Sequence, residues 1–275
     1  TDRILNALQY AIDNHADVVN MSYGMQGTDD LEHAKIVEAA DAGLILVASA
    51  GNDGESGFPD TETPAAYQEV IAVSAVGPND EFAPYSSWGP NNEIDIAAPG
   101  GDSDLGQAAY MFSTTITWPN GTTSDPVFGY DRVFTENGLT FPAQGTSFSA
   151  PHVAGAAALL LSAGVPATEV RDRLTSSARK PRTGSMDVKK YGAGILDVSA
   201  AMTSGSVLIS KPVKGSTVTD NPDFKITARG ITFDTLNVYL DYADGNQDDI
   251  PDDLTSEVPV LGGRASLLYL NAAHT

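Results

Sequence analysis

Mainly apolar runs alternate with helical patterns along the first part of the chain. We predict strands at 18–22, 44–50 and 70–76, and helices at 3–14 and 30–42, where apolar residues recur every three or four positions. Strands without polar alternation are typical of a parallel sheet that is buried on both faces. The pattern therefore predicts an α/β fold, in which helices cover both faces of a parallel sheet.

Two further helices are predicted at 148–162 and 167–178. Apolar residues fill most of the first helix, and Pro151 would stand in its first turn, where proline is tolerated. Thr168 is expected to cap the second helix. Both helices continue the α/β pattern.

The pattern changes after a small, polar stretch at 203–206. Short apolar runs at 207–209, 224–226 and 236–240 alternate with turn residues, which predicts antiparallel strands. We expect residues 207–275 to form the start of a β-sandwich domain that is too short to be complete.

Composition limits the classes of function. The 275 residues are 41% hydrophobic, enough for one large domain and part of a second. Thirty-six acidic residues against fifteen basic ones give a net charge of −21, which argues against nucleic acid as a partner and favours a secreted or extracellular setting. No apolar run is long enough to span a membrane, and without cysteine the chain has neither disulfides nor cysteine-ligated zinc.

The run from Gly145 to Gly155, GTSFSAPHVAG, places a hydroxyl where irregular backbone enters an apolar helix. Ser147 would then lie at the positive end of the helix dipole. A serine at this place is usually an N-cap, which satisfies backbone N–H groups of the first turn. From these residues alone, Ser147 is either a capping residue or a nucleophile.

The eleven-residue run resembles the serine-site signature of the subtilisin-like serine proteases, the subtilases, with Ser147 in the position of the nucleophile. Further segments resemble that family in the same order along the chain. They are Asn20–Gly24, Leu44–Gly54, Tyr85–Pro90, Ile94–Gly100 and Tyr191–Asp197. The resemblance covers about residues 1–203 and implies that they form the C-terminal two-thirds of a subtilisin-like catalytic domain.

The resemblance also implies roles for further residues. Asn52 would be the oxyanion-hole residue, whose carboxamide N–H donates to the negative oxygen that forms when a serine attacks a peptide carbonyl. Glu62 would lie near the floor of the first specificity pocket, where a carboxylate favours Lys or Arg. The backbone of two segments would line the cleft and pair with an extended substrate: Ser22, Tyr23 and Gly24, and Ala48, Ser49, Ala50 and Gly51.

Two members of a catalytic triad are missing from the pattern. A serine hydroxyl needs an adjacent base that a third group orients, and subtilases carry the aspartate and the histidine before the serine. His15 and His33 precede Ser147 but lie in helical patterns, His152 belongs to the serine signature, and His274 lies near the end. We therefore expect the chain to be part of a longer precursor, whose N-terminal remainder supplies both groups and is a partner of this segment.

A long segment between Asp102 and Gln144 is rich in Gly, Thr, Asn and Pro. It exceeds the connection typical of compact subtilisins, so we predict a surface insertion beside the cleft. The insertion is either a solvated decoration or a loop that shapes substrate choice or binds an ion.

Oxygen-bearing side chains crowd one segment of the C-terminal region. They are Asp241, Asp244, Asn246, Asp248, Asp249, Asp252 and Asp253. Hard cations prefer such ligands, but the spacing does not match an EF-hand, so the segment is either a calcium loop or a solvated hairpin tip. The family implies structural calcium, with ligands that the sequence does not identify, and no cofactor for catalysis.

Together, the residues and the resemblance favour a serine endopeptidase that hydrolyses peptide bonds through an acyl-enzyme on Ser147. The segment alone is expected to be nearly inactive, because it lacks the base. The main alternative is a non-catalytic subtilase-like module that binds peptides or serves as a scaffold, although such a module needs neither Ser147 nor Asn52. An α/β hydrolase acting on esters is disfavoured, because no Gly-x-Ser-x-Gly elbow surrounds Ser147.

Overall fold

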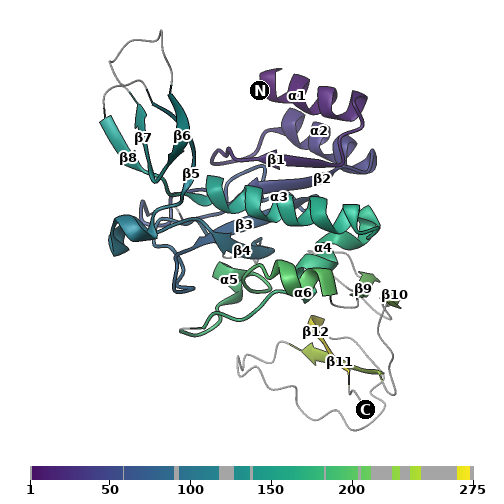
Figure 1. Ribbon diagram of the computed structural model, residues 1–275. Helices are drawn as coiled ribbons and strands as arrows, with labels where there is room; N and C mark the ends of the chain where they lie inside the picture. Colours follow the sequence, from purple (N-terminus) through teal and green to yellow (C-terminus); the bar gives the residue numbers. More distant parts are fainter. Residues whose placement is uncertain are drawn as a thin grey trace. The chain divides into compact units, whose positions relative to one another are not determined.

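The computed structural model describes residues 2–57, 59–89, 93–117, 127–136, 139–182 and 184–203, together with four strands beyond them. The chain divides into two compact units, Thr1–Thr203 and Ser204–Thr275. The first unit contains a parallel sheet and the helices that cover it (Figure 1).

Four parallel strands form the central sheet of the first unit, in the order β1-β2-β3-β4. They are β1 (Val18–Met21), β2 (Ile45–Ser49), β3 (Val70–Val76) and β4 (Ile96–Pro99). Every residue of β2 and β3 is buried, as expected for apolar strands with a neighbour on each side. The predicted parallel sheet is therefore confirmed.

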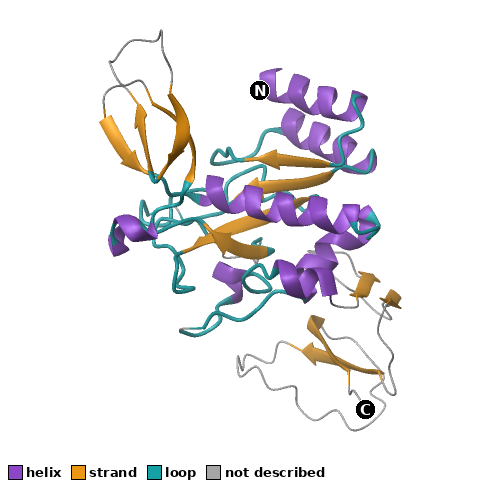
Figure 2. Cartoon of the chain, viewed as in Figure 1, coloured by secondary structure: helices purple, strands orange, loops and turns teal. Residues whose placement is uncertain are grey.

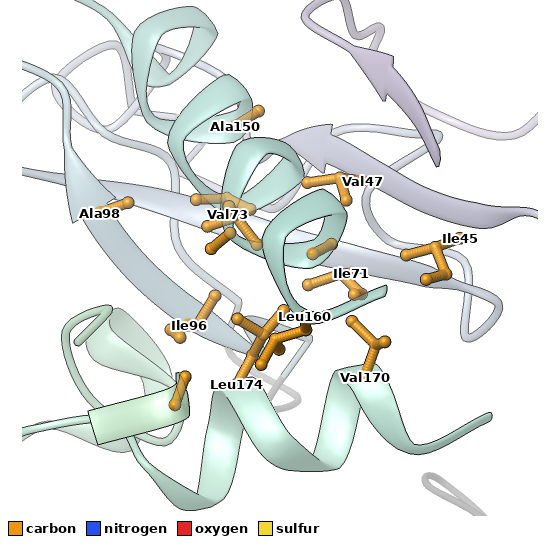
Figure 3. Packing of buried hydrophobic residues seen from close by; sticks show 14 residues of the cluster. Ile45, Val47, Ile71, Val73, Ile96, Ala98, Ala150, Leu160, Val170 and Leu174 are labelled. Atoms are coloured by element: carbon orange, nitrogen blue, oxygen red, sulfur yellow. The ribbon is translucent and has the colours of Figure 1, made fainter. Parts of the chain in front are cut away.

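One long helix, α3 (Thr146–Ser162), lies along one face of the sheet (Figure 1). Val47 and Val73 from the sheet pack with Leu160 of α3 and with Leu174 of a neighbouring helix in one buried cluster (Figure 3). That neighbour is α4 (Ala167–Ser176), and α6 (Val198–Thr203) also contributes to the cluster. This packing fixes α3 against the sheet and so positions the residues at its N-terminal end.

The other face of the sheet is covered by α1 (Asp2–Asp13) and α2 (Asp30–Asp41) (Figure 2). Leu46, the neighbour of Val47 in β2, packs there against Leu8 and Ile36, because successive side chains of a strand point to opposite faces. Helices therefore cover both faces, as the sequence predicts. A short further helix, α5 (Val188–Tyr191), packs near the end of β3.

The start of α3 corrects one prediction. The helix begins at Thr146, two residues earlier than expected, and Gly145 holds the N-cap position without a side-chain hydrogen bond. A glycine suits this position because its φ of 142° strains any residue with a Cβ. Ser147 therefore lies inside the first turn and is not the capping residue, and Pro151 lies beyond that turn.

The cap of α4 also differs from the prediction. Pro166 precedes the helix with φ −58° and ψ 142°, and no side chain caps it. The φ of Pro166 is close to that of a helix, but its ψ is extended, so the helix starts at the next residue. Thr168 lies inside the first turn, and the prediction that it caps the helix is wrong.

Between β4 and α3 the chain leaves the sheet in an excursion at 102–144, the segment expected to be an insertion. Two 3-10 helices open it, η1 (Ser103–Leu105) and η2 (Gln107–Ala109). Two antiparallel hairpins follow, β5 (Ser113–Thr117) with β6 (Val127–Asp131), and β7 (Val133–Glu136) with β8 (Leu139–Pro142). The hairpins stand out from the sheet near the start of α3 (Figure 1).

Four strands are described in the second unit, β9 (Ser206–Lys211), β10 (Lys225–Arg229), β11 (Leu236–Tyr242) and β12 (Ala265–Ala272). They form two antiparallel pairs, β9 with β10 and β11 with β12. A β-sandwich built from them stays a prediction. Asp241 lies in β11, whereas Asp244, Asn246, Asp248, Asp249, Asp252, Asp253 and His274 lie outside the described residues.

Candidate active site

Three consecutive residues at the start of α3 each contact a different strand end of the sheet. The backbone N–H of Gly145 donates to the carbonyl of Gly100, just after β4, at 2.9 Å. Thr146 bonds to the segment after β2, and Ser147 bonds to the segment after β1. The start of α3 therefore crosses the carboxyl edge of the sheet, where open α/β sheets bind their ligands.

Ser147 and Ser22 exchange two hydrogen bonds. The Ser147 hydroxyl donates to the carbonyl oxygen of Ser22 at 3.3 Å, and the Ser22 hydroxyl donates to the carbonyl oxygen of Ser147 at 2.9 Å. The Nδ2 group of Asn20 donates in turn to Ser22 Oγ at 2.9 Å. The end of β1 therefore holds the backbone of Ser147 in place, while its side chain stays half-buried.

Pro151 explains why the carbonyl of Ser147 is available to Ser22. Inside an α-helix this carbonyl would accept from the backbone N–H of residue 151, and proline has none. The Ser22 hydroxyl makes the bond instead. The proline thus ties the helix start to β1, a role that the sequence pattern does not reveal.

Asn52 is oriented by the backbone and side chain of Thr146. Its carboxamide oxygen accepts from the Thr146 N–H at 2.9 Å and from the Thr146 hydroxyl at 3.1 Å. These bonds fix which end of the amide is oxygen, so its NH₂ group turns away from Thr146. Because the Asn52 side chain is exposed, this NH₂ group can donate to an acceptor from outside.

The Thr146 hydroxyl also locks the turn that carries Asn52. Its oxygen lies 3.1 Å from the carbonyl oxygen of Gly51 and accepts from the Gly51 N–H at 3.2 Å. Gly51 adopts a φ of 111°, which favours glycine. The sequence motifs contain Thr146 and Asn20 but do not indicate these roles. Thr146 stands inside the serine signature, but no local signal shows that its partners lie at the end of β2.

Two N–H donors lie at or next to the start of α3, which bears the Ser147 hydroxyl. One is the NH₂ group of Asn52. The other is the backbone N–H of Ser147, which belongs to the first turn of α3 and has no carbonyl partner inside the helix. The positive end of the helix dipole adds to both. Donors of this kind can stabilise a negative oxygen that forms near this helix start.

The first predicted cleft segment, Ser22, Tyr23 and Gly24, lies next to Ser147 through the Ser22 contacts. The Tyr23 hydroxyl lies 3.3 Å from Oε1 of Glu32, and burial together with that carboxylate raises the pKa of Tyr23 well above its ordinary value. The phenol is therefore neutral. Pairing of this backbone with a substrate stays a prediction.

The second predicted cleft segment, residues 48–51, forms hydrogen bonds within the protein. Residues 48–49 lie inside β2, between β1 and β3. The Ala50 N–H donates to the carbonyl of Val73, and the Ala50 carbonyl accepts from the Glu62 N–H, both at 2.9 Å. The Gly51 N–H donates to the Thr146 hydroxyl, and the Gly51 carbonyl accepts from the Ser87 N–H. These bonds hold the segment in place, and its contact with a substrate stays a prediction.

The Glu62 carboxylate lies against the two glycines that flank the site. A Cβ on Gly24 would fall 2.2 Å from Glu62 Oε2, and a Cβ on Gly51 would fall 2.6 Å from Oε1. Burial and the charge of Asp53 raise the pKa of Glu62, while a hydrogen bond from the Asn52 backbone N–H opposes them. A partly buried carboxylate therefore lies beside the residue that carries the exposed amide.

His33 and His152 make their contacts elsewhere than at Ser147, and His15 lies just after α1. The Nε2 of His33 lies 3.2 Å from Glu69 Oε2. The Nδ1 of His152 lies 2.7 Å from a carbonyl oxygen of its own helix. His15 follows α1 with a φ of 53°. The general base that a nucleophilic serine needs is therefore not among these three side chains.

Within the residues that the structure describes, no group of three or more His, Asp or Glu side chains is arranged to hold a metal ion. None of the described helices combines the length and the apolar character needed to cross a membrane.

Known proteins resemble this chain over most of its first unit. The model of the subtilase family matches residues 1–194. The chain belongs to the subtilase family. This subtilase is 37% identical over 202 residues to subtilisin DY of Bacillus licheniformis, covering 72% of the chain and 61% of that protein. It is 36% identical over 201 residues to subtilisin E of Bacillus subtilis (strain 168), covering 72% and 44%.

Solved structures agree with this assignment. A protease from Pseudoalteromonas arctica PAMC 21717 superposes on the subtilase with a TM-score of 0.54 and 33% identity, over 68% of the chain and 50% of that protein. A lanthipeptide protease gives a TM-score of 0.56 and 26% identity, over 72% and 64%. The subtilase thus has a subtilisin-like fold and spans between 44% and 64% of the length of these relatives.

Proposed function

We propose that the subtilase is a serine endopeptidase with Ser147 as its nucleophile. One observation carries the proposal: Thr146 holds the Asn52 amide beside the helix start that bears Ser147. Membership of the subtilase family and the proteases among its solved relatives support the same function.

In the proposed reaction, Ser147 Oγ attacks the carbonyl carbon of a peptide bond while its proton passes to a histidine, which an aspartate orients. Both groups come from outside these 275 residues. The new C–O bond pushes the carbonyl electrons onto oxygen, and the oxyanion accepts hydrogen bonds from Asn52 and from the Ser147 N–H. Collapse breaks the C–N bond, the leaving amine takes the proton, and water hydrolyses the acyl-enzyme.

The hydrogen bond from the Ser147 hydroxyl to the Ser22 carbonyl is compatible with this reaction. At 3.3 Å between oxygens it is long for a hydroxyl donor and therefore weak. The hydroxyl can turn towards a base at small cost, while the Ser22 hydroxyl keeps holding the Ser147 backbone.

We also propose a substrate class. An extended protein or peptide substrate would run along Ser22 to Gly24, with the side chain before the cleaved bond directed at Glu62. The Glu62 carboxylate against Gly24 and Gly51 supports a preference for Lys or Arg at that position. A protein substrate agrees with the family.

A non-catalytic module that binds peptides or serves as a scaffold is the second candidate. One observation favours it, because the Ser147 hydroxyl bonds to a backbone carbonyl of Ser22 and not to a base. This module would bind a peptide along the same segment without cleaving it.

Two further properties belong to the proposal. An extracellular setting is supported by the net charge of −21. Structural calcium is supported by the oxygen-rich segment at 241–253, although the described residues provide no metal cluster and we assign no ligands. No cofactor is needed for the proposed catalysis.

The test uses the full-length protein that contains this chain. Casein hydrolysis should fall by about 10⁴-fold or more in Ser147→Ala, and a fluorophosphonate should label Ser147. Ser162→Ala, at the exposed end of the same helix, is the matched control and should retain activity. The isolated 275-residue segment should label far more slowly. Peptide binding by a wild-type protein that does not cleave would support the binding module.

A further inference from the structure

The Tyr85 hydroxyl lies among three glycine peptides next to the start of α3. Its oxygen is 2.9 Å from the carbonyl oxygen of Gly100 and 2.8 Å from that of Gly101. The same oxygen accepts a hydrogen bond from the Gly145 N–H at 3.1 Å. The phenol therefore donates its proton to one strand end and accepts from the helix start at the same time.

These three glycines flank the excursion at 102–144 on both sides. Gly100 and Gly101 lead out of β4, and Gly145 leads back into α3. The Gly145 N–H also donates to the Gly100 carbonyl, at 2.9 Å. The excursion is thus closed at a narrow neck, and the Tyr85 hydroxyl bonds to both sides of it.

Gly145 is the point at which a displacement of the neck would reach the site. It has no side chain to restrict it and adopts a φ of 142°. The following N–H, of Thr146, orients the Asn52 amide, and the residue after that is Ser147. A rotation of the Gly145 peptide would therefore displace the oxyanion donor and the nucleophile together.

We propose that Tyr85 is a positioning residue of the peptidase, whose hydroxyl fixes the Gly145 peptide and thereby aligns Ser147 with Asn52. This inference rests on the proposed function. The Tyr85 hydroxyl bonds to both ends of the excursion. In the proposed role, these bonds keep movements of the hairpins from displacing the Gly145 peptide.

Protonation of Tyr85 is consistent with this role. Burial raises its pKa well above the ordinary value. The phenol therefore remains a donor to the Gly100 and Gly101 carbonyls at neutral and at moderately alkaline pH. Deprotonation of Tyr85 therefore does not break these hydrogen bonds within that pH range.

Tyr191 offers a matched control for a buried phenol. Its hydroxyl donates to the backbone carbonyl of Asp80 at 3.2 Å, in the loop after β3, and takes no part in the neck. Tyr85→Phe and Tyr191→Phe each delete one hydroxyl that bonds to a backbone carbonyl. If the Tyr85 hydroxyl had only a structural role, the two deletions should affect kcat and the thermal midpoint in the same way.

The experiment measures kcat, KM and the thermal midpoint of the full-length protein and both variants on one peptide substrate. We expect Y85F to lose about tenfold or more in kcat with KM within about twofold, because a small misplacement of reacting groups acts on the chemical step. Y191F should change the thermal midpoint by about as much as Y85F does and leave kcat within about twofold of the wild type.

The outcomes separate the two proposals. An active wild-type protein whose kcat is unchanged in Y85F, or falls equally in Y191F, overturns the role of Tyr85 and leaves the peptidase standing. An inactive full-length protein overturns the proposed peptidase and this role with it. Should Y85F fail to fold, p-aminophenylalanine at position 85 replaces it, since this residue keeps a donor but accepts poorly from Gly145. The same loss of kcat is then expected, and an unchanged kcat overturns the role.

Discussion

The carboxamide oxygen of Asn52 accepts a hydrogen bond from the backbone N–H of Thr146 at 2.9 Å. The bond joins the end of β2 to the start of α3 across 94 positions of the sequence. Because the oxygen is engaged, the NH₂ end of the amide is the part that can face an incoming carbonyl. One contact therefore orients the donor and holds the residue before Ser147.

Replacing Thr146 by valine keeps the shape of the side chain and removes its hydroxyl. The Gly51 N–H then loses its acceptor, and leaving a buried donor unpaired costs about 1–3 kcal/mol. We expect a lower free energy of unfolding and a lower kcat, measured by urea denaturation and peptide hydrolysis of the full-length protein. Thr146→Ser keeps the hydroxyl and should behave like the wild type. Equal stability and kcat in T146V would refute this role of the hydroxyl.

Glu62 gives a pH-dependent prediction for specificity. Burial and the Asp53 charge raise its pKa, so the carboxyl is neutral at low pH and becomes charged at a higher pH than an ordinary glutamate does. The ratio of kcat/KM for Lys over Leu before the cleaved bond should therefore rise with pH through that raised value. In Glu62→Gln the ratio should be low at every pH.

The control for this experiment is Glu55→Gln, an exposed carboxylate in the same loop. It should leave both the ratio and its pH dependence unchanged. A wild-type protein that cleaves no faster after Lys or Arg than after Leu or Phe would remove Glu62 as a specificity residue.

Asp80 is a buried carboxylate that two arginines hold. Arg179 donates to its two oxygens at 2.6 and 2.7 Å, and Arg182 Nε donates at 2.7 Å. The bonds from Arg179, then those from Arg182, outweigh burial and lower the pKa of Asp80 well below its usual range. Its folded-state pKa therefore lies below the unfolded value of about 3.9. The contribution to stability is complete above the unfolded pKa and is lost as pH falls through the folded one.

Asp80→Asn should lower the free energy of unfolding by about 1–3 kcal/mol at pH 7, a modest value because the Arg179 and Arg182 side chains are 37% and 67% exposed. The difference from the wild type should shrink as pH falls below about 4, since the wild-type carboxylate then begins to lose its advantage. Urea denaturation at several pH values measures it. Glu38→Gln, which breaks the exposed pair with Lys35, is the control and should cost little. A difference that is constant with pH would contradict the account.

The sheet could be predicted from the sequence because its strands carry a strong local signal. The runs at 44–50 and 70–76 are almost entirely apolar, and both became fully buried strands. The serine site could be located because the signature around Ser147 is continuous in the chain. The start of α3 was harder to predict, because Gly145 caps the helix without a side chain and Pro151 lies inside the helix.

The contacts that orient the site could not be predicted, because they join residues that are distant in sequence. Ser22 and Ser147 are 125 positions apart, and nothing local shows that Pro151 leaves a carbonyl for Ser22 to bond. The bonds of Ala50 and Gly51 could not be predicted for a related reason. They depend on the order of the strands and on the turn after β2, which a single segment does not encode.

In the proposed reaction, the Asn52 amide receives the oxyanion that forms when Ser147 attacks a peptide bond. The most direct test is kcat and KM of Asn52→Ala in the full-length protein, with Asn6→Ala on the exposed side of α1 as the control. Loss of such a donor costs about 10²- to 10³-fold in kcat in subtilisin, a relative, and we expect a similar fall here with little change in KM. An N52A protein that keeps the wild-type kcat would contradict the claim.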